Sequence, residues 1–164
     1  SLKLISLIVI ILLLTLIKLP PALSCSNKLS LQIGNINSYI IKSGEVNSLP
    51  PLDTPPILYN GRTLVPIRLF VDTYGMKIKW EAETRKIYLE YGDKHIEFQI
   101  GRNYAIVLYL DQPEKQEKVQ LDIPPIIQNN RTLVPLRFIG ETFGSYVEWN
   151  ANEQRILVSW NTID

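Results

Sequence analysis

The sequence predicts an α+β protein built from two tandem, pseudo-symmetric copies of one unit, each a mostly antiparallel β-sheet with one short helix. Three observations predict it: an internal repeat, short runs in which apolar and polar residues alternate, and one helical pattern in each copy. The composition agrees, because 46% hydrophobic and 20% charged residues among 164 are typical of a globular chain.

The internal repeat is plainest in one motif. Residues 60–68 read Asn-Gly-Arg-Thr-Leu-Val-Pro-Ile-Arg, and residues 129–137 read Asn-Asn-Arg-Thr-Leu-Val-Pro-Leu-Arg, at an offset of 69. The same offset relates Gly75 to Gly144, Trp80 to Trp149, and two Asp-x-Pro-Pro-Ile segments at 53–57 and 122–126. Two copies, about residues 29–93 and 96–160, therefore fill most of the chain.

Alternating apolar and polar residues predict the strands. In chain order the expected strands are residues 31–33, 38–42, 57–59, 63–65, 76–80, 86–91, 98–100, 104–110, 146–149 and 155–160. The proline-rich segments 43–56 and 111–125 are expected to be loops. Asn60-Gly61 and Asn129-Asn130 predict tight hairpin turns, because these residues tolerate positive φ angles. Short hairpins leave no room for parallel crossovers, so the sheets are expected to be antiparallel.

One helix is expected in each copy, beginning at a proline. Pro66 and Pro135 suit the first helical turn, where a missing N–H costs nothing. Gly75 and Gly144 stand where a left-handed residue ends a helix. The expected apolar stripes are Ile67, Phe70, Val71 and Tyr74 in the first copy, and Leu136, Ile139 and Phe143 in the second. The expected core, shared by both halves, is Val65, Phe70, Trp80, Val134, Phe143 and Trp149. Replacing Phe143 by alanine should then cost about 3–5 kcal/mol.

The first residues predict export. After Lys3, residues 4–17 form an almost unbroken apolar run. This run is short for a membrane span, which needs about 20 residues, but it fits the roughly 7–15 residues of a signal-peptide core. Pro20 and Pro21 end the run, and Ser24 suits cleavage, so we predict a signal peptide at residues 1–24 and a mature domain at 25–164. A buried core helix is the alternative, which the Pro-Pro pair disfavours.

Cleavage after Ser24 makes Cys25 the first residue of an extracytoplasmic protein. It removes two lysines and leaves 15 basic against 16 acidic residues, a net charge of −1. Bacterial lipoproteins carry their lipid on such a cysteine, but Ala22 and Leu23 depart from the usual pattern before it. Lipid attachment at Cys25 and a free terminal thiol therefore both stay open. A single cysteine excludes a disulfide framework within the chain.

The repeated motifs carry a family resemblance. The two Asp-x-Pro-Pro-Ile segments, the Arg-Thr-Leu-Val-Pro motifs with the following Gly and Trp, and residues 133–144 resemble the copper amine oxidase N-terminal domain, also called the stalk domain. The resemblance covers about residues 29–160. It implies a small antiparallel sheet twisted around a helix. It also implies a non-catalytic domain of a kind found in many secreted and cell-envelope proteins of Gram-positive bacteria, usually without an oxidase.

The sequence does not support the oxidase chemistry that this family name suggests. Copper amine oxidases hold copper with three histidines and form their cofactor from the tyrosine of an Asn-Tyr-Asp/Glu motif. This chain has only His95, and its Asn103-Tyr104 pair is followed by Ala105. We therefore expect no enzyme activity, no cofactor, no metal and no catalytic residue. A Cys25–His95 pair, a glycosidase-type carboxylate pair and a calcium loop are weaker alternatives without a supporting motif.

Four arginines recur at matching positions of the two copies, namely Arg62, Arg68, Arg131 and Arg137. They suit either of two roles. One is binding of an anion or an acidic glycan. The other is structural, in which each guanidinium holds loop carbonyls or a carboxylate such as Asp53 or Asp122. We favour the structural role, because both copies keep both arginines beside core positions.

The sequence thus predicts a non-catalytic, exported stalk-type protein with a structural or binding role at the bacterial cell envelope. The alternative is a secreted glycan- or peptidoglycan-binding module that uses exposed aromatic residues and arginines. Its candidate aromatic face comprises Tyr59, Tyr88, Tyr91, Tyr109 and Trp160. The expected partner is an envelope polymer or another envelope protein, with membrane contact only through the signal segment or a lipid on Cys25. A net charge of +1 gives no basic face for nucleic acid, which we exclude.

Overall fold

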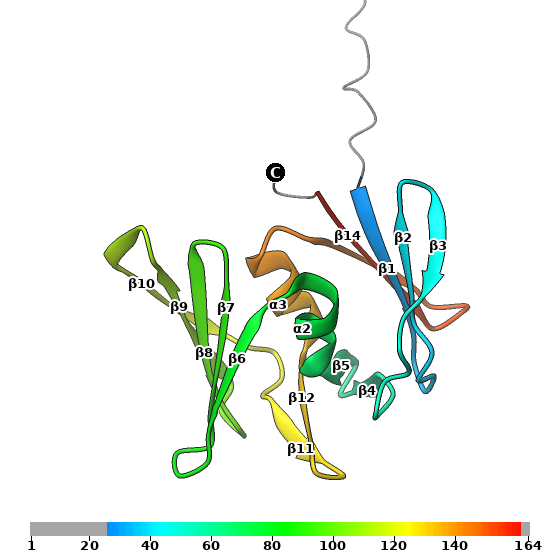
Figure 1. The fold of residues 1–164 in the computed structure, drawn as a ribbon. Helices are drawn as coiled ribbons and strands as arrows, with labels where there is room; N and C mark the ends of the chain where they lie inside the picture. The colour runs from blue at the N-terminus through cyan, green and yellow to red at the C-terminus, as the bar shows by residue number, and fades with distance from the viewer. Residues whose placement is uncertain (1–25, 162–164) are drawn as a thin grey trace, which may run out of the picture.

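The computed structural model describes residues 26–161, which form three β-sheets and two short helices (Figure 1). The predicted signal peptide and Cys25 lie outside the described residues, as do residues 162–164. Every pair of neighbouring strands in residues 26–161 is antiparallel, which confirms the predicted α+β class. Within this part of the chain, no helix is long and apolar enough to cross a membrane.

The first outer sheet brings the two ends of the described chain together. Its strands are β1 (Ser26–Gln32), β2 (Tyr39–Lys42), β3 (Glu45–Ser48), β13 (Tyr146–Asn150) and β14 (Arg155–Asn161). Their spatial order is β13-β14-β1-β2-β3. Strand β1 pairs with β14 over its whole length, ending with Gln32 opposite Arg155.

The second outer sheet comes from the middle of the chain. Its strands are β6 (Lys77–Glu81), β7 (Lys86–Tyr91), β8 (Lys94–Gln99), β9 (Tyr104–Tyr109) and β10 (Gln112–Gln120), in the spatial order β10-β9-β8-β7-β6. Each outer sheet therefore takes three strands from one sequence copy and two strands from the other. The copies do not form separate sheets, and the boundary expected between them falls in the β7–β8 hairpin.

The central sheet joins the two copies directly. Its strands are β4 (Ile57–Tyr59), β5 (Arg62–Pro66), β11 (Ile126–Gln128) and β12 (Arg131–Pro135), in the order β11-β12-β5-β4. In its middle, Val65 lies opposite Val134, the residue at the same position of the other copy. Both valines are fully buried. The same motif thus supplies both partners of the innermost strand pair.

Corresponding loops of the two copies make matching backbone hydrogen bonds. The N–H of Gly34 donates to the carbonyl of Pro56, and the N–H of Gly101 donates to that of Pro125, both at 2.9 Å. These bonds tie the end of the first strand of each copy to its Pro-Pro segment. The proline-rich segments are thereby held against the sheets.

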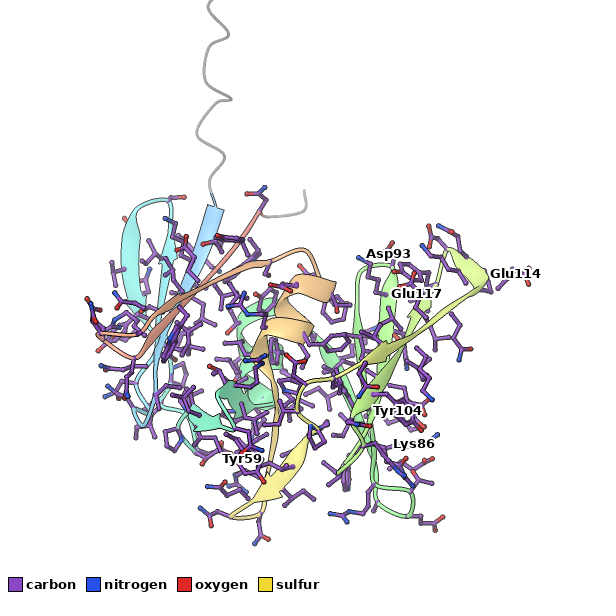
Figure 2. The ribbon with its side chains drawn as sticks, turned by 180° about the vertical axis from the view of Figure 1, so that it is seen from behind. Tyr59, Lys86, Asp93, Tyr104, Glu114 and Glu117 are labelled. Atoms are coloured by element: carbon purple, nitrogen blue, oxygen red, sulfur yellow. The ribbon has the colours of Figure 1, made fainter. Side chains whose placement is uncertain are left out.

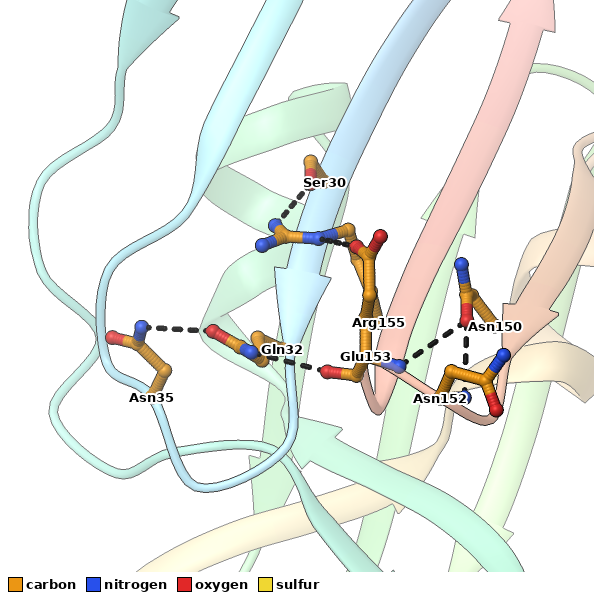
Figure 3. A network of polar contacts seen from close by, with 7 residues as sticks. All are labelled: Ser30, Gln32, Asn35, Asn150, Asn152, Glu153 and Arg155. Atoms are coloured by element: carbon orange, nitrogen blue, oxygen red, sulfur yellow. Dashed lines mark hydrogen bonds and ion pairs between the residues drawn. The ribbon is translucent and has the colours of Figure 1, made fainter.

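A polar network links β1 to the turn between β13 and β14 (Figure 3). The side-chain oxygen of Asn150 accepts hydrogen bonds from the backbone N–H groups of the turn residues Asn152 and Glu153, at 3.1 and 3.2 Å. The amide of Gln32 donates to the carbonyl of Glu153 at 3.1 Å, and Arg155 donates to the hydroxyl of Ser30 at 3.0 Å. Residues more than 100 positions apart in the sequence are therefore joined by polar side chains as well as by the strand ladder.

The predicted hairpin turns are confirmed, but two expected loops are wrong. Asn60 and Gly61 have φ angles of 49° and 73°, and Asn129 and Asn130 have 51° and 59°. The expected loop 43–56 contains β3, and the expected loop 111–125 contains β10. Both strands lie at sheet edges and are exposed almost throughout, so they lack the alternation that reveals a strand. Charged residues and proline are usual at such edges.

Helices α2 (Arg68–Tyr74) and α3 (Leu136–Thr142) lie between the two outer sheets (Figure 1). The expected helix start is wrong, because Pro66 and Pro135 end β5 and β12 instead. Gly75 ends α2 with a φ angle of 70°, as predicted. The expected stripe of α2 is wrong at Val71, which is exposed, whereas Leu69 is buried in its place.

The two helices differ at the position of Val71. In α3 this position is Gly140, which is buried. A Cβ atom at Gly140 would lie only 3.2 Å from Cγ2 of Val147 in β13, closer than most side chains tolerate. Glycine therefore lets α3 lie directly against β13, and Val147 is buried beneath it.

One apolar cluster runs through both sequence copies. Phe70, Val65 and Val134 are fully buried in it, as predicted. The predicted burial of Trp80 and Trp149 is wrong, since they are 43% and 39% exposed. The reason is their place in β6 and β13, which are edge strands of the outer sheets, so one side of each indole stays uncovered.

The position of Phe143 corrects the expected cost of removing its ring. Phe143 is only partly buried and packs edge-on against Tyr91, with ring centroids 5.8 Å apart. Because part of the ring remains in contact with water, the cost of Phe143→Ala falls below the figure for a fully buried phenylalanine.

A buried polar pair joins α2 to the second copy. The hydroxyl groups of Tyr74 and Ser145 are 2.8 Å apart and hydrogen-bonded. The Tyr74 ring also lies on that of Trp160 in β14, with centroids 4.6 Å apart. Burial raises the pKa of Tyr74 to about 12, although the hydrogen bond to Ser145 offsets part of the rise.

Candidate binding groove

A groove of about 730 Å³ opens beside α3. It lies between this helix, the edge strand β13, the β4–β5 hairpin and the segment that follows β10. Its walls include Leu58 and Trp149, which are 41% and 39% exposed. This volume falls within the roughly 300–1,000 Å³ of typical small-molecule sites.

A second hollow, of about 750 Å³, continues from the first over the edge of the outer sheet. The two hollows share Arg137, Val147 and Trp149 in their walls. Val147 is buried, so the exposed parts of this shared wall are the guanidinium and the indole. The second hollow extends over the other face of the sheet, where Glu148 and Leu157 lie opposite each other, and the two hollows adjoin at the edge strand β13. We call the two adjoining hollows the Trp149 groove.

The charges in the first hollow are paired with one another. Nε of Arg62 lies 2.7 Å from a carboxylate oxygen of Asp122, and Nη1 of Arg137 lies 3.1 Å from a carboxylate oxygen of Glu141. Nη1 of Arg137 also donates to the backbone carbonyl of Val147 at 3.0 Å. The first hollow thus carries two positive and two negative groups and no net charge. The second hollow adds Arg155, which forms an ion pair with Glu153, and the carboxylate of Glu148.

The other two candidate arginines lie away from this groove. Arg131 forms an ion pair with Asp53, just as Arg62 does with Asp122. Each of these pairs joins the hairpin of one copy to the Asp-x-Pro-Pro segment of the other. Arg68 lies exposed on α2, and within residues 26–161 its guanidinium makes no ion pair or hydrogen bond. This geometry gives Arg62 and Arg131 carboxylate partners of the kind that the structural interpretation names.

The five aromatic residues of the predicted sugar-stacking face do not gather on one face. Trp160 is 9% exposed, and Tyr91 and Tyr109 pack against the core. Tyr88 lies on the outer side of the second outer sheet, where its ring is 5.6 Å from that of His95. Tyr59 projects from β4 in the central sheet, well away from Lys86 and Tyr104 of the second outer sheet (Figure 2).

The residues considered for catalysis are not brought together. His95 is in β8, opposite Glu90 of β7, and Cys25 lies outside the described residues. Among residues 26–161, no three metal-ligating side chains form a cluster. Lys86 forms an ion pair with Glu97 at 2.6 Å across the same sheet, and this carboxylate raises the pKa of Lys86.

The sequence identified part of the groove and missed the rest. Its repeat singled out Arg62, Arg137 and Asp122. The sequence predicts Trp149 in the core instead, because alternation does not reveal which strand lies at an edge. The groove lies beside α3 and not beside α2. The sequence difference that accompanies this is Gly140, which stands where the other copy has Val71 and lets α3 lie against β13.

Comparison with protein families agrees with this architecture. The family model described as copper amine oxidase N-terminal domain matches residues 45–158, well over half of the chain. A search of curated proteins finds no match. The N-terminal stalk domain of the oxidase is a non-catalytic domain. The chain therefore belongs to the copper amine oxidase N-terminal domain family.

Proposed function

We propose that this chain is an exported, non-catalytic protein whose stalk-type domain has a structural or binding role at the bacterial cell envelope. The observation that carries the proposal is the match of residues 45–158 to a non-catalytic stalk domain. The apolar run at residues 4–17 supports export. Its expected partner is an envelope polymer or another envelope protein.

We also propose that the two sequence copies are related by a pseudo-two-fold axis that passes between Val65 and Val134. The pairing of these equivalent residues supports it. So do the equal division of strands between the outer sheets and the matching Arg62–Asp122 and Arg131–Asp53 pairs. An interlocked arrangement of this kind suits a load-bearing or spacer role, because the two copies cannot separate without breaking hydrogen bonds between paired strands.

Export is tested by the mature N-terminus. Expressed from its natural gene, the secreted or envelope-bound protein should begin at Cys25 or close to it, because residues 1–24 have signal-peptide organisation. N-terminal sequencing and intact mass measure this directly, and a diacylglyceryl mass on Cys25 would show anchoring. A mature protein that still carries residues 4–17 would contradict the proposal.

The absence of oxidase chemistry is tested by copper binding. Purified residues 25–164 should retain no stoichiometric copper after dialysis and should not oxidise benzylamine, because a single histidine cannot supply a three-histidine site. A His95→Ala variant is the control for weak surface binding. Equimolar copper that survives dialysis, or amine oxidation above the level without protein, would overturn the prediction.

A second candidate function is a glycan- or peptidoglycan-binding module. The Trp149 groove favours it, because an exposed indole stands there beside two guanidinium–carboxylate pairs. The dispersed positions of Tyr59, Tyr88 and Trp160 argue against the broader aromatic face predicted from the sequence.

A further inference from the structure

We propose that the Trp149 groove binds a neutral carbohydrate chain, with one sugar ring stacked on the indole of Trp149. The inference rests on the binding role proposed above and names the class of ligand. It concerns the half of the molecule around α3 and β13, where the groove lies.

The first step is the charge of the groove. Arg62 and Arg137 are each already paired with a carboxylate, at 2.7 and 3.1 Å. An anionic ligand would have to displace Asp122 or Glu141 or sit beside it, and like charges at such distances repel. A cation would meet the guanidinium groups in the same way. The paired charges of the first hollow therefore favour a ligand without net charge, and the Glu148 carboxylate in the second hollow disfavours an anion there as well.

The second step is the hydrogen-bonding capacity of the walls. The side chains of the Arg62–Asp122 pair and of the Arg137–Glu141 pair are all more than half exposed, so atoms outside each pair remain free for a ligand. Guanidinium groups only donate, and carboxylates only accept. A sugar hydroxyl does both, so neighbouring hydroxyl groups can contact a donor and an acceptor of the same ion pair.

The third step is the exposed indole. Trp149 is 39% exposed in a wall of the groove, and the exposed Leu58 also lines its first hollow. An aromatic ring held in such a place offers a flat apolar face to a ligand that has one. A pyranose ring has an apolar C–H face and a polar hydroxyl rim, which matches an indole flanked by charged pairs.

The fourth step is the extent of the groove. The hollows of about 730 and 750 Å³ share Trp149 and Arg137 in their walls, so the stacking position lies where they adjoin at the edge strand β13. A ligand seated on the indole can extend from the first hollow around this edge towards the second. This arrangement fits a chain of sugars better than a single one.

The internal repeat supplies a matched control. Trp80 occupies the position of Trp149 in the other copy and is similarly exposed, at 43%. It lies outside both hollows. Arg68, the counterpart of Arg137, has no ion pair within the described residues. Non-specific binding to exposed tryptophans would involve Trp80 and Trp149 equally, whereas binding at the proposed site involves Trp149 alone.

Titration calorimetry with defined hexasaccharides tests the proposal. The probes are maltohexaose, cellohexaose and chitohexaose, which are neutral, and hexagalacturonate, which is anionic. We expect at least one neutral probe to bind residues 25–164. Trp149→Ala should weaken that binding about tenfold or more, equivalent to about 1.4 kcal/mol, whereas Trp149→Phe should keep most of it and Trp80→Ala should leave it unchanged. Binding should persist in about 1 M NaCl, where the Debye length is only about 3 Å.

Three results would overturn the proposal: no binding of any neutral probe at millimolar concentration, equal losses in Trp149→Ala and Trp80→Ala, or binding of hexagalacturonate alone with a steep dependence on salt. The last would assign the arginines to an anion site.

The folding control is the thermal unfolding of Trp149→Ala, which should match that of the natural protein, so that a loss of binding is not a loss of fold. If the probes fail while the mature N-terminus is Cys25, the carbohydrate site falls and the exported role stands. If the probes bind but residues 4–17 are retained, the export proposal falls instead.

Discussion

Replacing Phe70 by alanine should lower the free energy of unfolding by about 3–5 kcal/mol and shift the whole unfolding transition. Phe70 is fully buried in the apolar cluster that contains residues of both sequence copies. A loss of this size is a large share of the roughly 5–15 kcal/mol by which domains are usually stable. Urea titration followed by fluorescence and by far-ultraviolet circular dichroism measures it, and the two signals should coincide.

The control for this variant is the next residue of the same helix. Val71 is 36% exposed, so Val71→Ala should change stability by no more than about 0.5 kcal/mol. The comparison separates loss of core packing from any effect on the helix itself. Two separate transitions in Phe70→Ala, with one of them unshifted, would show that the halves fold independently and would contradict the shared core.

Replacing Tyr74 by phenylalanine should cost about 1–3 kcal/mol at neutral pH, because it leaves the buried hydroxyl of Ser145 without the partner that lies 2.8 Å away. Ser145 is only 7% exposed, so water does not readily replace the lost bond. The double variant Tyr74→Phe with Ser145→Ala removes both hydroxyl groups. It should recover part of the loss, which a thermodynamic cycle over the four proteins measures.

The same residue predicts how stability depends on alkaline pH. Burial raises the pKa of Tyr74 to about 12, whereas a tyrosine in the unfolded chain ionises near 10. The stabilisation by the buried neutral phenol is complete below pH 10 and is lost as the pH rises towards 12, by roughly 2–3 kcal/mol in all. Tyr74→Phe lacks this ionisation, so the stability difference between it and the natural protein should shrink above pH 10. A difference that stays constant from pH 8 to 12 would contradict the assignment.

The local elements could be predicted because each has a local signal. The turns at Asn60-Gly61 and Asn129-Asn130 depend on residues that accept positive φ angles, and the observed angles confirm them. Gly75 ends α2 for the same reason. The strands with one buried face, such as β7 and β14, show alternating residues and were found.

The pairing of strands between the copies could not be predicted from the sequence. A repeat shows that two segments fold alike, but it does not show whether each closes on itself or exchanges strands with the other. The partner of β1 is β14, more than 120 residues away, and only the three-dimensional structure reveals this pairing. The edge positions of Trp80 and Trp149 are likewise not visible in the sequence, because β6 and β13 each pair with a single neighbouring strand. Alternation alone therefore predicts both indoles in the core.

The candidate site was predictable only in its charged part. Repetition at a fixed offset singled out Arg62 and Arg137, but Arg131 and Arg68 carry the same signal and lie elsewhere. What distinguishes the two halves is a small difference in packing, Gly140 in place of Val71, which brings α3 against β13. The effect of this substitution on packing can be inferred only when the strand that packs against the helix is known.

The central claim is that the two sequence copies form a single interlocked unit that holds the groove, and native-state amide hydrogen exchange tests it most directly. We predict that the slowest amides of β1 and β14, of β7 and β8, and of β5 and β12 open with free energies that agree within about 1 kcal/mol with one another and with global unfolding. These strand pairs lie in three different sheets, and each pairs a strand of the first copy with a strand of the second. An outer sheet that opens with a clearly lower free energy than the other two sheets would contradict the claim.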